Sequence, residues 1–525
     1  MTRLIRNNAR NLIIPFIFYS AWVFSAPPSI TFQVDHFTLE GNSPLPSKDI
    51  SKFLSQYEGK QYDLTGLQNV SKRLESKIRD TGYAFYRVTL PPQSLSGGNV
   101  NFKLVSFSLD DIEMSGNAYF GNDNVLASLP QLIHGQSPNT QLLTHQIKVA
   151  NHHVDKEVTV VFKQSDTADQ IAAKVDVIEN KPFHYSLLAN NTGSNETGNI
   201  RTTAAFQYSN LWNKDHNINL SYTTSPNHYN DVKQYGLSYA LPIYASGGWL
   251  SAYYAQSDVN TGRVAISSNS GLDVSGSGEM FGIHYLHFLP KVGNYEHAFD
   301  IGFDNRYFDN TVTLFDDLST SEDIAPDVRS TPITLLYKGN IPFKTFHLGH
   351  HIALSKNLGI GSQNENSDYN NSRLHARSDW AILRYGLLAN MNIEGWLFRI
   401  NLKGQYTTES LISGEQFGLG GTYSVRGYSE REVGHDIGNS LNIEAFTPPW
   451  RGVKLLAFYD YGHGRNHDVQ PDEQRDHQLA SIGIGAIFQW KSYLFASVDL
   501  GHTLKNAGET QKNHNHAHAN IVLQF

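Results

Sequence analysis

The stretch of this chain with the most distinctive chemistry runs from Gly420 to Glu430 and has the sequence GGTYSVRGYSE. Three glycines surround one arginine and two tyrosines, so the backbone can turn tightly while those side chains project from it. An arginine folded into a protein interior needs a carboxylate, which its planar guanidinium can hold by two hydrogen bonds. The G-x-x-x-x-G-K-[ST] pattern of a phosphate-binding loop is absent. A glycine-rich surface loop and an arginine site are both open interpretations.

Few other residues could do chemistry. His514, His516 and His518 alternate along the final segment. A metal site is one interpretation, but an ordinary polar strand face is favoured because no further ligand is identifiable. The chain has no cysteine, no G-x-S-x-G or H-E-x-x-H motif, and no convincing pair of catalytic carboxylates. We therefore predict that the protein is not an enzyme and holds no metal or cofactor.

The N-terminus has the pattern of a secretory signal peptide. Arg3, Arg6 and Arg10 precede an apolar run from Leu12 to Phe24, and small residues follow. The run is short for a membrane anchor, so we predict that residues 1–25 are removed after Ser25 and that the protein is exported. A net charge of −8 gives no reason to expect a nucleic-acid partner.

Two small α/β domains are predicted to follow, at residues 29–107 and 108–180. The first has the order β-α-α-β-β, with elements at Ile30–Leu39, Ser47–Tyr57, Thr65–Asp80, Ala84–Leu90 and Val100–Phe107. The second repeats that order more faintly, with elements at Leu109–Met114, Asn122–Leu132, Thr140–Ala150, Glu157–Lys163 and Gln170–Ile178. The weaker helical periodicity of the second copy makes its boundaries harder to define.

From Phe183 to Phe525 the residues alternate with period two. Between Gly395 and Tyr406, for example, large apolar side chains occupy one face while arginine, asparagine, lysine and glutamine occupy the other. Soluble sandwiches also alternate, but charges opposite continuous apolar faces and segments of about ten residues favour an outer-membrane barrel with a wet lumen. We predict a barrel of 16 antiparallel strands, within a range of 14 to 18. Long outer loops are expected at 258–275, 315–327, 361–375, 408–438 and 464–477.

The final strand ends the chain on Phe525. Its alternate residues Ala517, Ala519, Ile521 and Leu523 are apolar, as a lipid-facing strand requires. A terminal aromatic residue resembles the C-terminal recognition signal of bacterial outer-membrane barrels. The resemblance implies that the barrel-assembly machinery and periplasmic chaperones are partners in biogenesis, and that outer-membrane lipid surrounds the folded chain.

Several motifs resemble one family of transporters. The two small domains resemble polypeptide-transport-associated (POTRA) domains, and the Gly82-Tyr83 step and the Leu90-Pro91-Pro92-Gln93 turn are similar to the first such domain of haemolysin secretion/activation-type, two-partner secretion transporters. The sequence Val425-Arg426-Gly427-Tyr428 is similar to the V-R-G-Y/F motif on the sixth outer loop of their superfamily. Its companion F-x-D-x-G is matched by Phe458, Asp460 and Gly462.

This resemblance implies that Arg426 pairs with Asp460 inside the barrel. Strand alternation is compatible with that pairing, because the apolar face of Val453–Tyr461 meets lipid and Asp460 then points into the lumen. Glu444 points inward on the preceding strand and is the alternative partner. An inward arginine without a carboxylate would be costly, but the pair could also serve only to brace the barrel.

The resemblance implies a function as well: an outer-membrane pore, working as a monomer, that passes one large β-helical exoprotein from periplasm to cell surface. The partner would arrive unfolded and be recognised through its N-terminal secretion domain. Edge strands of the small domains could capture it by strand addition. The candidate docking residues are Ala84, Phe85, Tyr86, Arg87, Val88, Thr89 and Leu90, with Glu157–Lys163 as a second edge.

Two further expectations follow from the resemblance to that family. An N-terminal plug helix, which several members carry, is expected to be missing, because only about four residues separate Ser25 from the first strand at Ile30. A barrel-assembly factor of the same superfamily is the alternative function. The presence of two POTRA-like domains, rather than the larger number expected of assembly factors, favours the transporter.

Overall fold

The computed structural model describes residues 30–194, 197–258, 262–267, 270–274, 277–309, 313–315, 321–323, 327–469 and 474–525, with side chains undescribed at 259–276 and 310–326. The predicted signal peptide therefore lies outside the described residues, and the predicted loops at 258–275 and 315–327 are described only in part. No helix in the described part of the chain is long and apolar enough to cross a membrane.

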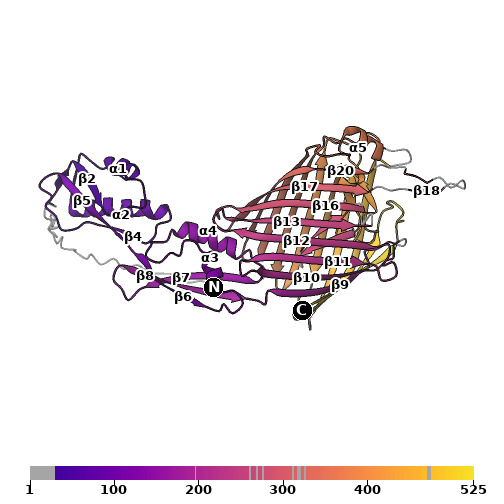
Figure 1. Cartoon of the computed structure of the whole chain (residues 1–525), viewed down its shortest axis with the longest axis horizontal. Helices are drawn as coiled ribbons and strands as arrows, with labels where there is room; N and C mark the ends of the chain where they lie inside the picture. Colours follow the sequence, from indigo (N-terminus) through magenta and orange to yellow (C-terminus); the bar gives the residue numbers. More distant parts are fainter. Residues whose placement is uncertain are drawn as a thin grey trace, which may run out of the picture. The chain divides into compact units, whose positions relative to one another are not determined.

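The first compact unit ends at Ser106 and is an α/β domain. Its three-stranded sheet has the order β2-β5-β4, and a short pair β1-β3 accompanies it. The helices lie over the sheet (Figure 1). The elements are β1 (Phe32–Val34), β2 (His36–Glu40), α1 (Ser47–Ser55), β3 (Lys60–Tyr62), α2 (Leu64–Asp80), β4 (Tyr86–Thr89) and β5 (Asn99–Ser106).

The core of this domain follows from the periodicity of α2. Leu67, Leu74 and Ile78 recur on one helical face and are completely buried, against Phe102 of β5. Two boundaries differ from the sequence prediction. The strand expected over Ile30–Leu39 is split at Asp35, whose N–H donates to the Gly98 carbonyl. Strand β4 begins at Tyr86, because residues 84–85 still belong to the turn after α2.

The second unit, residues 107–525, contains a second small sheet and a barrel. The sheet has the order β6-β8-β7, with β6 parallel to β8 and β7 antiparallel to it. Its elements are β6 (Ser108–Ser115), α3 (Asn122–Ala127), α4 (Thr140–Ala150), β7 (Lys156–Gln164) and β8 (Gln170–Glu179). Helix α3 is shorter than the predicted Asn122–Leu132, because Pro130 disfavours helical geometry at the residue before it.

Buried polar contacts join this second domain to the barrel. Nζ of Lys156 lies 2.5 Å from a carboxylate oxygen of Asp215, and both side chains are almost completely buried. His153 is buried beside them: its Nε2 contacts the Ser209 carbonyl at 2.6 Å, and its Nδ1 accepts from the Asp155 N–H at 3.1 Å. The neutral Nε2–H tautomer is the one that satisfies both contacts. Burial accordingly lowers the pKa of His153 below its ordinary value.

The barrel is closed and antiparallel, with 16 strands around its wall, as predicted. Neighbouring strands β9 to β17 stand side by side in Figure 1. Strands β20 and β21 follow each other along the same place in the wall and count as one barrel strand, because both pair with β17. The wall consists of β9 (Phe183–Asn190), β10 (Arg201–Leu211), β11 (His216–Thr224), β12 (Lys233–Ile243), β13 (Gly248–Ser257), β16 (Ser277–Phe288), β17 (Glu296–Asp309), β20 (Val328–Ser330), β21 (Pro332–Pro342), β22 (Phe346–Asn357), β23 (Ala381–Ile393), β24 (Trp396–Thr407), β27 (Ile437–Phe446), β28 (Val453–Arg465), β29 (Asp476–Trp490), β30 (Leu494–Thr503) and β31 (Asn515–Gln524).

The outer connections between wall strands include two short hairpins and one helix. The hairpins are β14 (Gly262–Ser267) with β15 (Ser270–Val274), and β18 (Thr313–Phe315) with β19 (Ser321–Asp323). Helix α5 (Asn366–Ser372) occupies the predicted loop at 361–375. Its buried Tyr369 belongs to one apolar cluster with Trp380 and with Ile382 of β23, which attaches this loop to the barrel wall.

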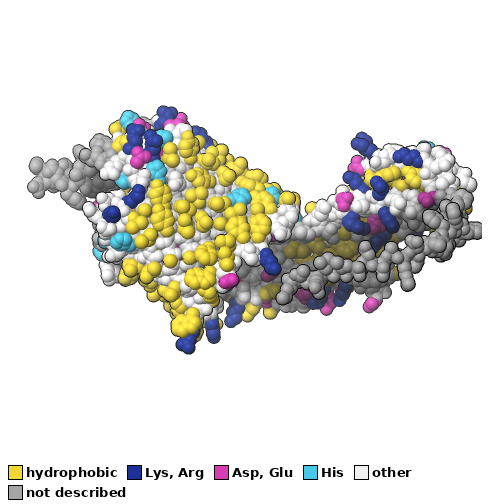
Figure 2. Space-filling view, turned by 180° about the vertical axis from the view of Figure 1, so that it is seen from behind, with side chains coloured by type: hydrophobic (Ala, Val, Ile, Leu, Met, Phe, Trp, Pro, Cys, Tyr) yellow, Lys and Arg dark blue, Asp and Glu magenta, His cyan; other side chains and the backbone are white. Residues whose placement is uncertain are grey.

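The two faces of the wall differ in chemistry as the alternation predicts. Apolar side chains such as Leu335, Ile352 and Leu455 are exposed on the outside, and Figure 2 shows hydrophobic side chains over a broad band of the barrel face. On β28 the alternate residues Asp460 and Phe458 are buried on the other side of the wall. An apolar exterior and a polar interior are what a barrel in lipid requires.

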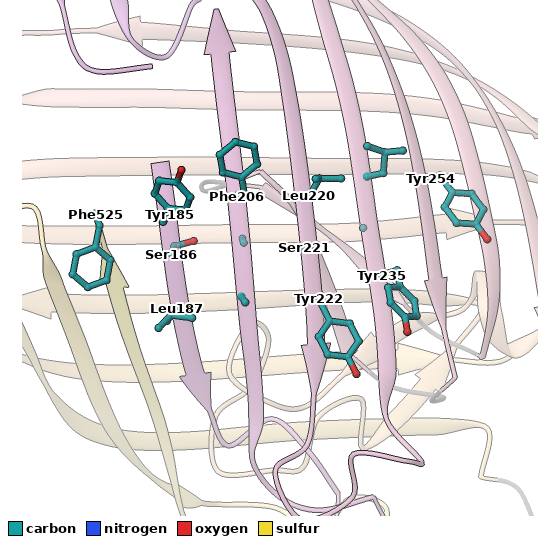
Figure 3. A pocket seen from close by; sticks show the side chains of 14 residues that line it. Tyr185, Ser186, Leu187, Phe206, Leu220, Ser221, Tyr222, Tyr235, Tyr254 and Phe525 are labelled. Atoms are coloured by element: carbon teal, nitrogen blue, oxygen red, sulfur yellow. The ribbon is translucent and has the colours of Figure 1, made fainter. Parts of the chain in front are cut away.

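The barrel closes where β31 meets β9. Five residue pairs join them, from Asn520 with Asn190 to Gln524 with Ser186. Phe525 extends the pairing, since its N–H donates to the Tyr185 carbonyl at 2.8 Å and its own carbonyl accepts from Tyr185. Figure 3 shows both rings on the outer face beside Phe206 of β10. The terminal aromatic residue is thus part of the closing seam.

Candidate functional site

Residues 408–438, called the inward hairpin below, connect β24 to β27 and enter the lumen. A 3-10 turn, Ser413–Glu415, precedes two short strands, β25 (Phe417–Leu419) and β26 (Val433–His435), which pair with each other. The tip between them holds the V-R-G-Y sequence. Val425 and Tyr428 are completely buried there, with Leu479 of the wall. The surface-loop interpretation of the glycine-rich stretch is therefore wrong.

The guanidinium of Arg426 meets Asp460 of β28 through two parallel contacts. Nε lies 2.8 Å from Oδ2 and Nη2 lies 2.9 Å from Oδ1. The Arg426 backbone N–H also donates to Oδ2, at 3.1 Å, and Asn442 donates its side-chain amide to Oδ1. Asp460 is completely buried, so these donors replace all of its hydration. This bidentate geometry is the strongest form of an arginine–carboxylate contact.

Two more carboxylates contact the same guanidinium. Nη2 lies 3.0 Å from Glu444 of β27, and Nη1 lies 3.1 Å from Asp499 of β30. Glu444 was the alternative partner from the sequence, and the structure places it beside Asp460 rather than in competition with it. Burial lowers the pKa of Arg426, but Asp460, with help from the other two carboxylates, raises it above its ordinary value. The arginine therefore ties three strands of the wall, β27, β28 and β30, to one loop.

Phe458 completes the cage around the guanidinium, whose carbon lies 3.6 Å from the centre of the ring. Such stacking on an aromatic face favours arginine over lysine. The motif F-x-D-x-G thus supplies a ring and a carboxylate from alternate positions of one strand face. The glycine of the motif, Gly462, makes room for the hairpin tip.

Glycines make room for the hairpin tip against the wall. A β-carbon at Gly462 would lie 2.9 Å from side-chain carbons of both Leu419 and Val425. One at Gly501 would lie 2.6 Å from the backbone nitrogen of Gly427. Gly427 itself has φ +94°, a left-handed conformation that favours glycine. Both loop and wall therefore need glycine where their backbones approach.

Further contacts fix the tip on either side of Arg426. The Gly427 N–H donates to Nε2 of His518 on β31 at 3.0 Å, and Nδ1 of His518 lies 3.1 Å from the hydroxyl of Thr422. The Tyr428 hydroxyl donates to the Lys505 carbonyl at 2.8 Å. Both ring nitrogens of His518 thus face the hairpin. Across the described residues, no group of three or more histidine and carboxylate side chains has the geometry to hold a metal ion.

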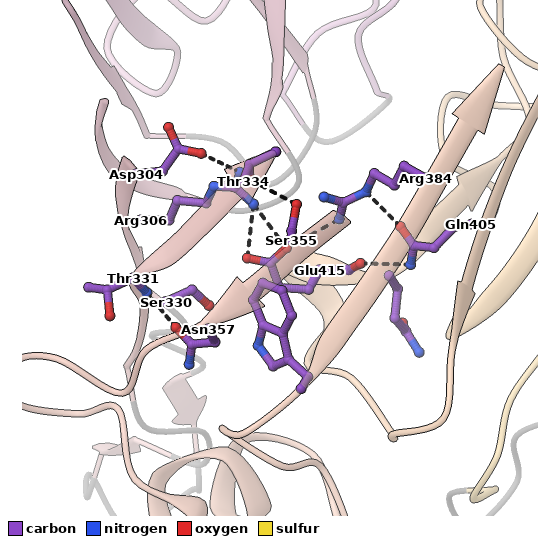
Figure 4. Close-up of polar contacts among 12 residues, drawn as sticks. Asp304, Arg306, Ser330, Thr331, Thr334, Ser355, Asn357, Arg384, Gln405 and Glu415 are labelled. Atoms are coloured by element: carbon purple, nitrogen blue, oxygen red, sulfur yellow. Dashed lines mark hydrogen bonds and ion pairs between the residues drawn. The ribbon is translucent and has the colours of Figure 1, made fainter. Parts of the chain in front are cut away.

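Glu415, which sequence reasoning missed, anchors the base of the inward hairpin to the opposite part of the wall. Its carboxylate is buried and lies 3.0 Å from Nη1 of Arg306 on β17 and 3.3 Å from Nη2 of Arg384 on β23. Arg306 also contacts Asp304 at 2.8 Å, and Gln405 donates to the Glu415 carbonyl at 3.0 Å. Figure 4 shows both arginines pointing at Glu415. No local sequence pattern marks this residue, because its partners come from strands far along the chain.

The predicted docking residues lie in and around β4, at one edge of the sheet in the first domain. Ala84 and Phe85 precede the strand, Tyr86, Arg87, Val88 and Thr89 form it, and Leu90 follows it. Glu75 of α2 accepts the Val88 N–H at 3.1 Å, so one backbone donor of this edge is already used. The second predicted edge, Glu157–Lys163, lies within β7, at the edge of the β6-β8-β7 sheet.

Comparisons with known proteins give relatives over most of the chain. The family described as haemolysin secretion/activation protein ShlB/FhaC/HecB matches residues 170–488, and the ShlB-type POTRA domain matches residues 32–106. The heme/hemopexin transporter protein HuxB of Haemophilus influenzae (strain 86-028NP) is 20% identical over 495 residues, covering 89% of this chain and 82% of the relative.

Two solved structures share the fold. CdiB from Escherichia coli has a TM-score of 0.71 and 16% identity, with 98% of this chain and 93% of that chain covered. CdiB from Acinetobacter baumannii has a TM-score of 0.66 and 16% identity, with 95% and 91% covered. At these identities the likeness concerns the fold: small α/β domains followed by a 16-strand barrel.

Proposed function

The chain belongs to the haemolysin secretion/activation family (ShlB/FhaC/HecB), and from this premise we propose that it exports one large β-helical exoprotein by two-partner secretion. The protein is an outer-membrane β-barrel transporter with N-terminal POTRA domains in the periplasm, and it works with a cognate secreted exoprotein. Members of the family are transporters rather than enzymes. The proposal adds the kind of cargo and the route.

The inward hairpin is the observation that carries this proposal. It occupies the lumen and is attached to the wall at Arg426 and at Glu415 through charged contacts. Opening the tip would have to break both these charged contacts and the apolar packing of Val425 and Tyr428 against Leu479. We propose that the hairpin holds the resting barrel in shape and that its Arg426 contact opens during transport.

Capture of the unfolded cargo is assigned to the periplasmic domains. Strands β4 and β7 are edges of three-stranded sheets, to which an extended peptide can add by backbone hydrogen bonds. Each edge already uses part of its backbone: Glu75 accepts the Val88 N–H of β4, and the Asn151 side chain bonds both the N–H and the carbonyl of Val158 on β7. The secretion domain at the N-terminus of the exoprotein is the proposed ligand. Folding of the exoprotein outside the cell would bias its movement, because a folded chain cannot slide back.

The testing experiment is secretion of the neighbouring-gene product, followed by immunoblot of culture medium. Deleting the transporter should abolish release of that one exoprotein, and the wild-type gene should restore it. Arg426→Ala should restore little release although the barrel remains in the outer membrane. Broad loss of outer-membrane proteins on deletion would instead identify a barrel-assembly factor. Release at the wild-type level from Arg426→Ala would remove the proposed role of the hairpin.

The capture step has its own test. A protein lacking residues 29–107 should keep its barrel but release no exoprotein. Heat-modifiable migration on gels reports whether the barrel is folded. Unchanged secretion by this truncated protein would rule out docking on the first domain and leave β7 as the remaining candidate edge.

A further inference from the structure

The hydrogen bonds of His518 fix the protonation state of its ring while the tip of the inward hairpin is docked. The ring lies against the tip, and only 4% of the residue is exposed. The Gly427 N–H donates to its Nε2 at 3.0 Å. A ring nitrogen that accepts a hydrogen bond carries no proton, so the proton of the neutral ring is on Nδ1 and is donated to the Thr422 hydroxyl at 3.1 Å. The docked tip therefore requires neutral His518 in one tautomer.

A protonated His518 cannot keep these contacts. Protonation would put an N–H on Nε2, directly opposite the Gly427 N–H, so that two donors would face each other. Among the described residues this backbone N–H meets no other acceptor, and a buried donor without an acceptor is unfavourable. The Gly427 nitrogen is also packed tightly against β30, because a β-carbon at Gly501 would lie only 2.6 Å from it. Protonation therefore breaks a contact of the docked tip and replaces it with none.

The charged groups on the neighbouring elements do not balance a positive charge on His518. On the hairpin, Arg426 directly precedes the residue that donates to the ring. On β30, Asp499 is the register partner of His518, but one of its oxygens accepts from Arg426 at 3.1 Å. Its other oxygen is directed at β29, on the opposite side of β30, since a β-carbon at Gly485 would lie 2.0 Å from it. On the β9 side of β31 the polar neighbour is Asn191, which is uncharged.

The remaining titratable groups near the ring have partners or are themselves basic. Glu430 of the hairpin accepts a backbone N–H of the tip at 2.7 Å. Glu432 accepts the Thr510 N–H at 2.8 Å. On β31, the ring of His516 lies 4.7 Å from that of His518, centre to centre, and gains positive charge in the same pH range. A proton on His518 is therefore opposed from its own strand as well as from the hairpin.

We propose that His518 is a positioning residue for the V-R-G-Y tip and makes its docking depend on pH: the neutral ring holds the tip, and the protonated ring releases it. In the undocked state the ring takes up a proton as an ordinary histidine does, at about pH 6.5. Because the undocked state then binds one proton more than the docked state, docking is fully effective above this pH and weakens progressively below it. The part that this dependence plays in opening the pore rests on the proposed function.

Cysteine labelling of the tip tests the proposal. Val425→Cys places a thiol where the side chain is completely buried when the tip is docked, so the maleimide labelling rate reports undocking. The full-length protein is labelled in nanodiscs, and each rate is divided by that of glutathione at the same pH to remove the titration of the thiol. Between about pH 7.5 and about pH 5.5 the normalised rate should rise about tenfold. A flat profile, with the barrel folded, would overturn the proposal.

Three variants of the Val425→Cys protein assign the effect to one ring. His518→Gln stays uncharged and should label at nearly the same rate at both pH values. His518→Lys is charged at both and should label quickly at both. His516→Gln is the matched control, from the same strand face but without a hydrogen bond to the hairpin among the described residues, and it should keep the rise.

Two results would contradict this assignment. Slow labelling of His518→Lys at about pH 7.5, at the rate of the parent, would show that the tip tolerates a charge there. A rise that is lost in His516→Gln and kept in His518→Gln would belong to the wrong residue. If His518→Gln is undocked already at about pH 7.5, the parent and His516→Gln decide: a rise in both supports the proposal, and its absence from the parent overturns it.

Secretion in cells separates this inference from the proposed function. The labelling uses no exoprotein, so its result does not depend on what the protein transports. Export that persists after deletion of the transporter overturns the proposed function and leaves pH-dependent docking intact. A flat labelling profile in a protein whose deletion abolishes export overturns the role of His518 alone. Heat-modifiable migration at both pH values confirms that each barrel is folded.

Discussion

Replacing Arg426 by alanine should release the tip of the inward hairpin from the barrel wall. The substitution leaves Asp460, which is completely buried, without its cation, and it removes the guanidinium that Glu444, Asp499 and Phe458 also contact. Removing one partner of a buried ion pair costs about 3–5 kcal/mol, because the other charge stays buried and unpaired. At about 1.4 kcal/mol per factor of ten, the equilibrium constant for docking of the hairpin tip should fall by about a hundred- to several-thousandfold.

Cysteine labelling measures this equilibrium. The chain has no cysteine, so Val425→Cys introduces a single thiol at a position that is completely buried when the hairpin is docked. When opening and closing are faster than the reaction, the maleimide labelling rate reports the undocked fraction. The rate should rise by about two to three and a half orders of magnitude in Arg426→Ala relative to the parent Val425→Cys protein.

Two further variants test the reasoning. Arg431→Ala removes the other arginine of the tip, which donates to the carbonyl oxygens of Ser413 and Gln416, and should change the rate little. Adding Asp460→Asn to Arg426→Ala removes the unpaired charge and should recover part of the loss. A labelling rate in Arg426→Ala within threefold of the parent, with the barrel folded, would refute the role of the charge.

Three other predictions concern single residues. Asp460→Asn should raise labelling of the buried cysteine at least tenfold, because an amide cannot accept all the donors that Asp460 meets. Asp499→Asn should have little effect, because one oxygen of Asp499 accepts the arginine contact and the other has no partner in the described structure. Equal effects of the two substitutions would contradict this ranking. Glu415→Gln should cost about 3–5 kcal/mol and lower the midpoint temperature of the heat-modifiable gel shift, and an unchanged midpoint would argue against the second anchor. Burial lowers the pKa of His153, so the unfolded chain binds more protons than the folded chain below about pH 6.5. Resistance to urea should therefore decrease as the pH falls from about 7.5 to about 5.5 in wild type, and should decrease less in His153→Gln. Parallel pH profiles of the two proteins would contradict the neutral tautomer.

Much of the fold could be predicted because its signals are local. The alternation of apolar and polar residues in the barrel strands follows from lipid outside and water inside, and it is visible strand by strand. Helix α2 shows its buried face through Leu67, Leu74 and Ile78 in the same way. Boundaries were less predictable. Helix α3 ends early because of one proline, and β4 begins late because the turn after α2 continues through Phe85.

The arginine site was partly predictable and partly not. The pair of motifs pointed to Arg426 and Asp460, and strand parity pointed to Glu444. Asp499 gave no such signal, because a single aspartate on an alternating strand has the same pattern whether it faces water or a loop. Glu415 gave no signal in the sequence either, because its partners Arg306 and Arg384 belong to other strands.

By itself the sequence determined the class of the protein: export, small α/β domains, a barrel wall with defined inner and outer faces, and an arginine loop with a matching carboxylate strand. These properties depend on residue type and on spacing along one segment. The tertiary structure decided which segments meet. Closing the barrel places three carboxylates from β27, β28 and β30 around one guanidinium, and it places Glu415 against β17 and β23. Spacing along the chain carries no record of such contacts, because barrel closure and the fold of one long loop create them.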